Sequence, residues 1–299
     1  MRPRVVLRAL EAALLRGLLR LLGLLSATAA SNLGGAVARA IGPALPVSRV
    51  AEANLRLAMP GLDAAARRRI VRGVWENLGR TVAELPHLPA MCLQAGRAGY
   101  EVVGAEELLR LAAAGEPAVV FSGHLANWEL LIPVAAAHGI RIGLIYRAPS
   151  NPAADAVLRE LRRAAMRHDV PMFPKGAEGA RGALAHLRGG GVLGLLIDQK
   201  MNDGIAAPLF GHAAMTAPAG ASLALRFRCR VIPVHAERLG PARYRVVVEP
   251  SLPLPDSGNR TADVATLTAA MNASLERWIR DRPAEWLWLH RRWPNRVYT

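Results

Sequence analysis

The sequence predicts an α/β protein with a mostly parallel central sheet flanked by helices, an N-terminal helical annex and a basic amphipathic helix at the N-terminus. From Pro117 onward, short apolar runs alternate with helical stretches, which is typical of parallel strands joined by right-handed crossovers. Residues 30–95 show helical spacing, and the first 25 residues are rich in leucine and arginine. We therefore expect three parts, residues 1–28, 29–95 and 96–299.

Composition and charge narrow the class of protein. The chain has 299 residues and is 52% hydrophobic, which allows a sizeable core and argues against disorder. Cys92 and Cys229 lie far apart without a Cys-x-x-Cys neighbour, so the sequence predicts neither a disulfide framework nor a metal site, and it indicates a reducing compartment. The net charge of +15 predicts an acidic partner. No zinc-finger or RNP-like pattern supports nucleic acid, so anionic lipid or an acidic protein is expected.

The N-terminal segment, residues 1–28, is expected to lie on a membrane. Charged residues interrupt its apolar stretch, and each would cost roughly 2.5–3.5 kcal/mol near the bilayer centre, so spanning is disfavoured. On a helical wheel the charges occupy one half, and the other half is formed by Leu7, Leu10, Leu14, Leu18, Leu21 and Leu25. Two alternatives remain open, a signal peptide cleaved after the small residues at 26–30 and an ordinary packed helix.

The remaining elements follow in order along the chain. In the annex, helices are expected over Arg49–Met59 and Ala64–Leu85, the second capped by Asp63. Parallel strands are predicted at Ala118–Ser122, Ile142–Tyr146, Val170–Phe173, Val192–Ile197 and Arg230–Glu237. Tyr244–Glu249 is expected to pair antiparallel with the last of these, and Thr261–Asp281 is expected to form a closing helix.

The most informative segment for catalysis is Phe121-Ser-Gly-His-Leu-Ala-Asn-Trp-Glu129. It follows a hydrophobic strand and precedes an apolar helix. Ligands of open α/β sheets bind at the carboxyl ends of the strands, where His124 lies. With His124 in the loop and Glu129 in the first helical turn, the carboxylate can orient the imidazole, which then takes a proton from a hydroxyl. The alternative is that both residues merely cap and solvate a helix start.

The His-x4-Glu spacing resembles the motif of the glycerolipid and lysophospholipid acyltransferase superfamily. Further segments narrow this resemblance to the lipid A biosynthesis lauroyl/myristoyl acyltransferases: Tyr146-Arg147 with Asn151-Pro152, Leu196-Ile-Asp-Gln-Lys200, Pro208-Leu-Phe-Gly211, Ala214-Met-Thr216, Val231-Ile-Pro233 and Trp286-Leu-Trp-Leu-His-Arg-Arg-Trp293. The resemblance covers nearly the whole chain and implies a glycerolipid acyltransferase-like fold.

The resemblance also implies roles for individual residues. It makes His124 and Glu129 the catalytic dyad and places Arg147, Asp198 and Gln199 in the acceptor pocket. Asp198 ends a strand and lies beside His124 if the two strands are neighbours, whereas a structural cap is the alternative. The remaining expected substrate contacts are Asn127, Trp128, Tyr146 and Arg162, of which Trp128 is as readily a packing residue. A surface location is the alternative for Arg147.

Two other segments each have two interpretations, and a third has one. Pro208–Thr216 is interpreted as a loop that either contacts a headgroup or forms a tight turn. The aromatic and basic segment Trp286–Trp293 suits either a membrane interface or a packed C-terminal strand or turn. Gly189-Gly-Gly191 is interpreted as a turn, because no phosphate-loop lysine follows it.

The expected function is transfer of an acyl chain from a thioester to a hydroxyl of a lipid A precursor, without metal or cofactor. The resemblance implies acyl carrier protein as donor, with coenzyme A as the alternative, and a location on the cytoplasmic face of the inner membrane. Another lipid acceptor, such as a lysophospholipid or a glycosylated phosphatidylinositol, keeps the same chemistry. A hydrolase using Ser222 would need a Gly-x-Ser-x-Gly elbow that the sequence lacks, and a non-catalytic membrane-binding protein is the third alternative.

Overall fold

The computed structural model describes residues 3–91, 98–146, 151–166, 170–174 and 176–298. Within these ranges the central sheet has seven strands in the order β1-β9-β8-β2-β5-β3-β4. Their bounds are β1 Gly99–Val103, β2 Ala118–Ser122, β3 Ile142–Tyr146, β4 Met172–Pro174, β5 Val192–Leu196, β8 Arg230–Gly240 and β9 Arg243–Val248. β8, β2, β5, β3 and β4 are mutually parallel, and β9 runs antiparallel to β8. This confirms the predicted α/β fold with a mostly parallel sheet.

Two parts of the strand assignment differ from the prediction. β1 pairs with β9 at the sheet edge and was not predicted. The segment interpreted as a loop forms a separate antiparallel hairpin of β6 (Ile205–Leu209) and β7 (His212–Thr216). Its two-residue turn places Phe210 and Gly211 at φ of 53° and 74°, the left-handed conformation that glycine adopts without strain. The tight-turn alternative for this segment is therefore confirmed.

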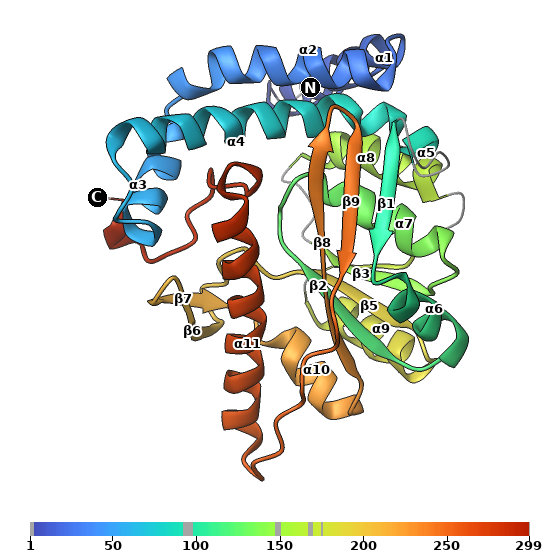
Figure 1. Cartoon of the computed structure of the whole chain (residues 1–299). Helices are drawn as coiled ribbons and strands as arrows, with labels where there is room; N and C mark the ends of the chain where they lie inside the picture. Colours follow the sequence, from blue (N-terminus) through green and yellow to red (C-terminus); the bar gives the residue numbers. More distant parts are fainter. Residues whose placement is uncertain (1–2, 92–97, 147–150, 167–169, 175, 299) are drawn as a thin grey trace.

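The two faces of the sheet are covered by different helices (Figure 1). α7 (Leu131–Ala137) and α8 (Pro152–Met166) pack on one face, together with Val234 of β8 and Val246 of β9. α10 (Ala219–Phe227) and α11 (Arg260–Asp281) pack on the other, where they meet Phe121 of β2, and α9 (Ala177–Arg188) packs beside α10. Alternate residues of each strand therefore serve separate cores.

The annex consists of α2 (Ala27–Ile41), α3 (Ser48–Ala58) and α4 (Ala64–Glu84), and α4 crosses above the sheet (Figure 1). Asp63 caps α4 as predicted, since its side chain accepts a hydrogen bond from the backbone nitrogen of Ala66 at 2.6 Å. α2 and α4 approach closely through Gly34 and Gly79, because a Cβ on Gly79 would lie 2.2 Å from the backbone oxygen of Gly34. Any larger residue there would push the two helices apart.

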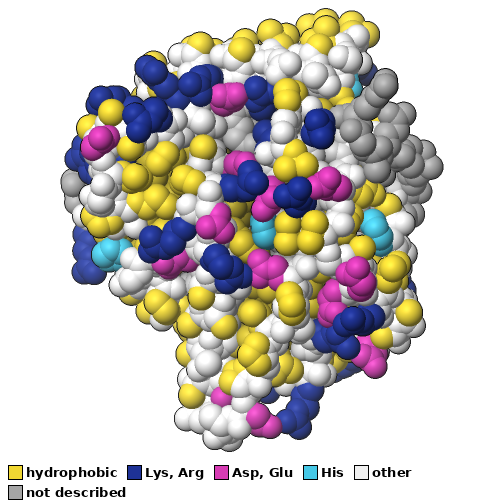
Figure 2. All heavy atoms as spheres, viewed as in Figure 1, with side chains coloured by type: hydrophobic (Ala, Val, Ile, Leu, Met, Phe, Trp, Pro, Cys, Tyr) yellow, Lys and Arg dark blue, Asp and Glu magenta, His cyan; other side chains and the backbone are white. Residues whose placement is uncertain are grey.

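The N-terminal helix α1 (Pro3–Gly23) packs on the body through one side only. Leu19 and Leu22 are buried, whereas most leucines predicted for the apolar half are exposed: Leu10, Leu14, Leu18, Leu21 and Leu25. Figure 2 shows the resulting hydrophobic rim along the edge formed by α1 and α2. Among the described residues no helix combines the length and apolarity needed to cross a membrane.

The C-terminal segment is packed rather than surface-lying. Trp286, Trp288 and Trp293 are fully buried, and the Trp286 and Trp288 rings meet edge to face with centroids 4.6 Å apart. Arg292 is also buried, where it donates to the backbone oxygen of Met215 and to the hydroxyl of Thr216 in the β6–β7 hairpin. Burial lowers the pKa of Arg292 to about 10. The packed-turn interpretation of this segment is thus confirmed.

Candidate active site

His124 and Asp198 follow two neighbouring strands at the same end of the sheet. β2 and β5 pair in register, with Ser122 opposite Leu196, and the backbone nitrogen of Ile197 donates to the oxygen of Ser122 at 3.0 Å. His124 and Asp198 each lie two residues beyond the end of their strand, so they come to lie opposite one another. The sequence predicted this neighbourhood on condition that the strands pair, and they do.

The Asp198 carboxylate orients His124. His124 Nδ1 lies 2.7 Å from Asp198 Oδ1, and the backbone nitrogen of His124 donates to Asp198 Oδ2 at 2.8 Å. Burial alone would lower the pKa of His124, but Asp198, assisted by the charge of Glu129, raises this pKa above its ordinary value. Burial alone would likewise raise the pKa of Asp198, yet the imidazole holds it well below its ordinary value. With Nδ1 bound to Asp198, Nε2 is the nitrogen left for a substrate proton.

Glu129 forms an ion pair with Arg162 next to this pair. Arg162 of α8 donates from Nε to Glu129 Oε2 and from Nη2 to Glu129 Oε1, both at 2.7 Å. The indole nitrogen of Trp128 donates to the same carboxylate at 3.2 Å. Glu129 lies in a single turn of 3-10 helix, Trp128–Leu130, directly before α7. The predicted substrate contact Arg162 is thereby fixed beside the predicted catalytic glutamate, while Asp198 occupies Nδ1 of the histidine.

The other predicted contacts divide into two groups. Trp128, Tyr146 and Gln199 line the cavity beside His124, and the Trp128 ring meets the imidazole edge to face at 5.0 Å. Asn127 lies elsewhere, because its amide donates to the buried carboxylate of Glu84 at 2.9 Å. Arg147 falls outside the described residues. Among the described residues no group of three or more histidine, cysteine or acidic side chains could hold a metal ion.

An apolar cavity of about 210 Å³ extends from His124 along the α7 face of the sheet. Its walls include Val120 of β2, Ile142 and Leu144 of β3, and Val234 and Val246 of β8 and β9. His124, Glu129, Tyr146 and Arg162 are its charged or titratable lining, so the polar chemistry lies at the strand carboxyl ends. Apolar cavities of about 150 Å³ already stay dry and take up apolar molecules. This cavity therefore suits a hydrocarbon chain whose reactive end meets His124.

The C-terminal segment, which sequence reasoning linked only to packing or a membrane, holds the site in place. Trp286 Nε1 donates to Asp198 Oδ2 at 2.8 Å, and His290 Nε2 lies 2.9 Å from the backbone oxygen of Asp198. The backbone nitrogen of Leu287 donates to the oxygen of His124 at 3.0 Å. The sequence signal for this role is an indole donor in a tryptophan-rich segment, since buried indole nitrogens require a partner.

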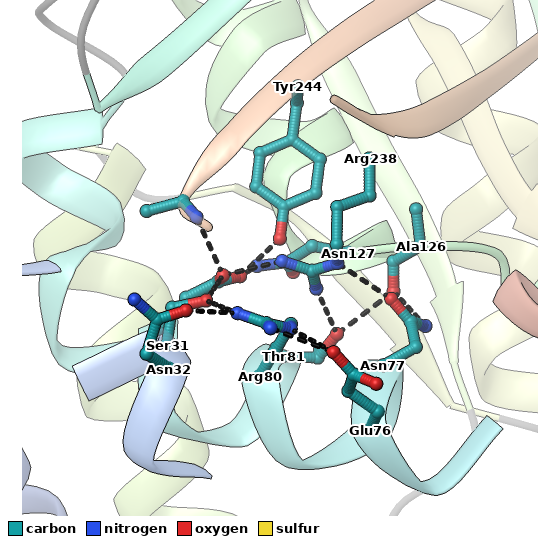
Figure 3. Close-up of polar contacts among 12 residues, drawn as sticks. Ser31, Asn32, Glu76, Asn77, Arg80, Thr81, Ala126, Asn127, Arg238 and Tyr244 are labelled. Carbon is teal, nitrogen blue, oxygen red and sulfur yellow. Dashed lines mark hydrogen bonds and ion pairs between the residues drawn. The ribbon is translucent and has the colours of Figure 1, made fainter. Parts of the chain in front are cut away.

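Glu84, the last residue of α4, is a completely buried carboxylate like Asp198 and was not predicted. Its Oε1 accepts from Ser31 at 2.7 Å, Arg238 at 2.6 Å and the backbone nitrogen of Ala242 at 3.1 Å, and its Oε2 accepts from Asn127 and the Tyr244 hydroxyl. Figure 3 shows the labelled donors converging from α2, the loop after β2 and the strands β8 and β9: Ser31, Asn127, Arg238 and Tyr244. The network thus ties the annex to the loop that carries His124.

The loop after β2 is also fixed by its own backbone. Ala126 adopts a positive φ of 47°, and its carbonyl accepts from Asn77 at 3.0 Å and Thr81 at 2.9 Å, both on α4. Its backbone nitrogen donates to the oxygen of Glu285 at 3.0 Å. An L-residue in this conformation costs roughly 1–2 kcal/mol, which these contacts offset.

A search of curated proteins finds no match to this chain. The family model described as bacterial lipid A biosynthesis acyltransferase matches residues 4–295, nearly the whole length. This match agrees with the histidine and carboxylate placed at the end of an apolar cavity, and the chain belongs to the bacterial lipid A biosynthesis acyltransferase family.

Proposed function

We propose that the protein transfers a fatty acyl chain from acyl carrier protein to a hydroxyl of a lipid A precursor. Membership of the family implies an acyltransferase of lipid A biosynthesis, hence acyl transfer to a lipid. The observation that carries the finer proposal is the His124–Asp198 pair at one end of the apolar cavity.

In the proposed reaction His124 acts as the general base. Nε2 takes the proton of the acceptor hydroxyl while the hydroxyl oxygen attacks the thioester carbonyl carbon, which gives a tetrahedral oxyanion. Collapse of this oxyanion breaks the carbon–sulfur bond and forms the ester, and the leaving thiolate takes the proton from the imidazolium. Asp198 holds the tautomer with the proton on Nδ1 and stabilises the imidazolium, a role supported by the 2.7 Å contact.

Glu129 and Arg162 are proposed to act together on the substrate. Glu129 occupies two of the N–H groups of Arg162, and the guanidinium, which lines the cavity, donates its other N–H groups to no further residue among those that the structure describes. Such a cation can stabilise the oxyanion or hold an acceptor phosphate. Arg147, which the resemblance places in the acceptor pocket, is proposed as a second cation that stabilises the oxyanion.

The protein is further proposed to work on the cytoplasmic face of the inner membrane, held there by an apolar ridge. The ridge consists of exposed side chains from α1, α2 and the turn after each: Leu10, Leu14, Leu18, Leu21, Leu24, Leu25, Leu33, Val37, Ile41, Leu45 and Val47. Exposed apolar patches of this extent mark membrane or protein interaction sites. α2 enlarges the surface that the sequence assigned to residues 1–28 alone.

The test is transfer of labelled acyl chain from acyl carrier protein to detergent-dispersed lipid A precursor. Wild type should form the ester, whereas His124→Ala and Glu129→Ala proteins with unchanged circular dichroism should lose at least ~100-fold in rate. Lysophospholipid and glycosylated phosphatidylinositol acceptors, and acyl coenzyme A as donor, form the parallel arms. Ester formation only with another acceptor would refute the lipid A assignment, and a fully active His124→Ala protein would refute the mechanism.

A further inference from the structure

A second hollow lies on the surface between α3, the start of α4 and the C-terminal turn. It is lined by six arginines, namely Arg49, Arg56, Arg68, Arg72, Arg291 and Arg296. Glu52 is the carboxylate among its lining residues, and Pro43 and Pro46 form the end nearest to α2. We call this hollow the arginine groove. Figure 2 shows basic side chains gathered at this corner of the molecule, over α3 and the start of α4.

Among the described residues, the lining of the arginine groove carries six arginines and one carboxylate. Glu52 is engaged by Arg56 at 3.1 Å and by Arg67 at 2.7 Å. In the part of the chain that the structure describes, Arg49, Arg68 and Arg72 are exposed and form no ion pair. Like charges brought together in one hollow repel each other, and an anionic ligand relieves that repulsion. The groove therefore has the charge of an anion-binding surface.

The position of the arginine groove beside the apolar ridge indicates which anion it binds, namely lipid phosphate. Pro43 and Pro46, which line the groove, alternate along the chain with Ile41, Leu45 and Val47 of the ridge. When the apolar face of an interfacial helix sinks about 5–10 Å into the bilayer, neighbouring basic side chains reach the level of the lipid phosphates. Arginine suits that environment, because its planar guanidinium binds phosphate oxygens in pairs.

We propose that the arginine groove binds the phosphate groups of anionic membrane lipids at the end of the apolar ridge and thereby fixes the orientation of the enzyme on the membrane. The proposal rests on the proposed membrane location. It adds a second, electrostatic contact on the annex, distinct from the cavity beside His124. Attachment should consequently depend on anionic lipid and weaken with salt, whereas the ridge alone would bind neutral and anionic membranes alike.

The test is co-sedimentation of the full chain with vesicles of phosphatidylcholine, with or without phosphatidylglycerol. The variant is Arg49→Glu, Arg68→Glu and Arg72→Glu together. The matched control reverses three exposed arginines on α9 and α10, at the end of the molecule away from α1 and α2: Arg181→Glu, Arg188→Glu and Arg226→Glu. Both triple glutamate variants carry the same net charge. A milder variant with glutamine at the three groove positions removes the charges without reversing them, and it shows whether weaker binding of the glutamate variant comes from misfolding.

The groove variant should bind phosphatidylglycerol vesicles roughly 100-fold more weakly than the control, while weak binding to pure phosphatidylcholine stays equal. Equal binding of both triple variants to phosphatidylglycerol vesicles would refute the proposal. Unchanged vesicle binding with lost binding of acyl carrier protein would also refute it and would assign the groove to the carrier. His124→Ala should bind vesicles like wild type, so failure of the catalytic proposal remains distinguishable from failure of this one.

Discussion

Asp198, just after β5, and Glu84, at the end of α4, are both completely buried carboxylates. Their partners differ, and so do the roles that we expect for them. Asp198 binds His124, a titratable side chain whose pKa is raised above its ordinary value and whose ring lines the apolar cavity. Glu84 is surrounded by donors that keep their protons: the guanidinium of Arg238, the Asn127 amide, two hydroxyls and a backbone N–H. Burial next to Glu84 raises the pKa of Tyr244 well above its ordinary value.

The comparison teaches that a buried carboxylate does not by itself identify an active site. What distinguishes Asp198 is its titratable partner His124 at the wall of a cavity. His124 can gain or lose a proton while the charge of the Asp198 carboxylate stays buried. Glu84 instead joins α2, α4, the loop after β2 and the β8–β9 turn. Removing the carboxylate at Asp198 should therefore affect catalysis, and removing it at Glu84 should affect stability.

Asp198→Asn should give the largest effect on activity, a loss of about 10²–10⁴-fold in kcat. Asp198 Oδ2 accepts from the backbone nitrogen of His124 and from Trp286 Nε1, so the amide oxygen of asparagine must take that position. The amide nitrogen then faces His124 Nδ1 and forces the ring proton onto Nε2, where it blocks the base. Steady-state kinetics of acyl transfer measures the loss.

The pH dependence sharpens the same prediction. The base is competent only above the pKa of His124, so the rate rises with pH through that pKa, and in wild type this rise should lie above the ordinary value of about 6.5. In Asp198→Asn the residual activity should rise at lower pH, because burial then lowers the pKa of His124 with only the smaller effect of Glu129 opposing it. A variant that keeps the wild-type rate and pH profile would contradict the assigned role of Asp198.

Glu84→Gln should instead destabilise the fold by roughly 3–5 kcal/mol, because it leaves the buried guanidinium of Arg238 without its counter-charge. Activity per folded molecule should fall far less than in Asp198→Asn. Denaturant unfolding checks the difference. Glu101→Gln is the control, since its pair with Arg245 is exposed and should contribute at most about 1 kcal/mol. Equal stability of both variants would show that the Glu84 network does not hold the annex.

Local sequence patterns predicted most strands of the central sheet and the residues that directly follow them. The position of Asp198 beside His124 follows from two apolar runs that pair as parallel strands, and short continuous apolar runs of this kind are typical of fully buried strands. The Glu129–Arg162 pair could not be predicted, because the His-x4-Glu spacing suggested that Glu129 faces the histidine, while Arg162 lies 33 positions away on α8.

For contacts across long chain distances, no local pattern in the sequence indicated which residues would pair. Glu84 meets Arg238 across 154 positions, and Trp286 meets Asp198 across 88. Neither lies in a periodic pattern that points to the other, because tertiary packing decides which buried donors meet which buried acceptors. For the same reason Asn127, which lies inside the catalytic motif, was expected at the substrate although it binds Glu84.

Trp286→Phe should give the smallest effect and separates orientation from packing. The aromatic ring remains, but Asp198 Oδ2 loses the indole N–H at 2.8 Å while keeping the backbone donor of His124. Because the carboxylate is then less well stabilised, its attraction for the imidazolium increases and the pKa of His124 should rise, a shift opposite in sign to that of Asp198→Asn. kcat should fall about tenfold, in keeping with the loss of one charge-assisted hydrogen bond.

Trp288→Phe is the matched control, because its indole nitrogen donates to the backbone oxygen of Pro283 and not to the carboxylate. Both variants remove one N–H from the same buried aromatic cluster, so their stabilities should change by similar amounts. Only Trp286→Phe should move the pH profile of acyl transfer to higher pH. If both variants shift the profile equally, the C-terminal tryptophans act on His124 through packing alone, and Trp286 has no separate role in positioning Asp198.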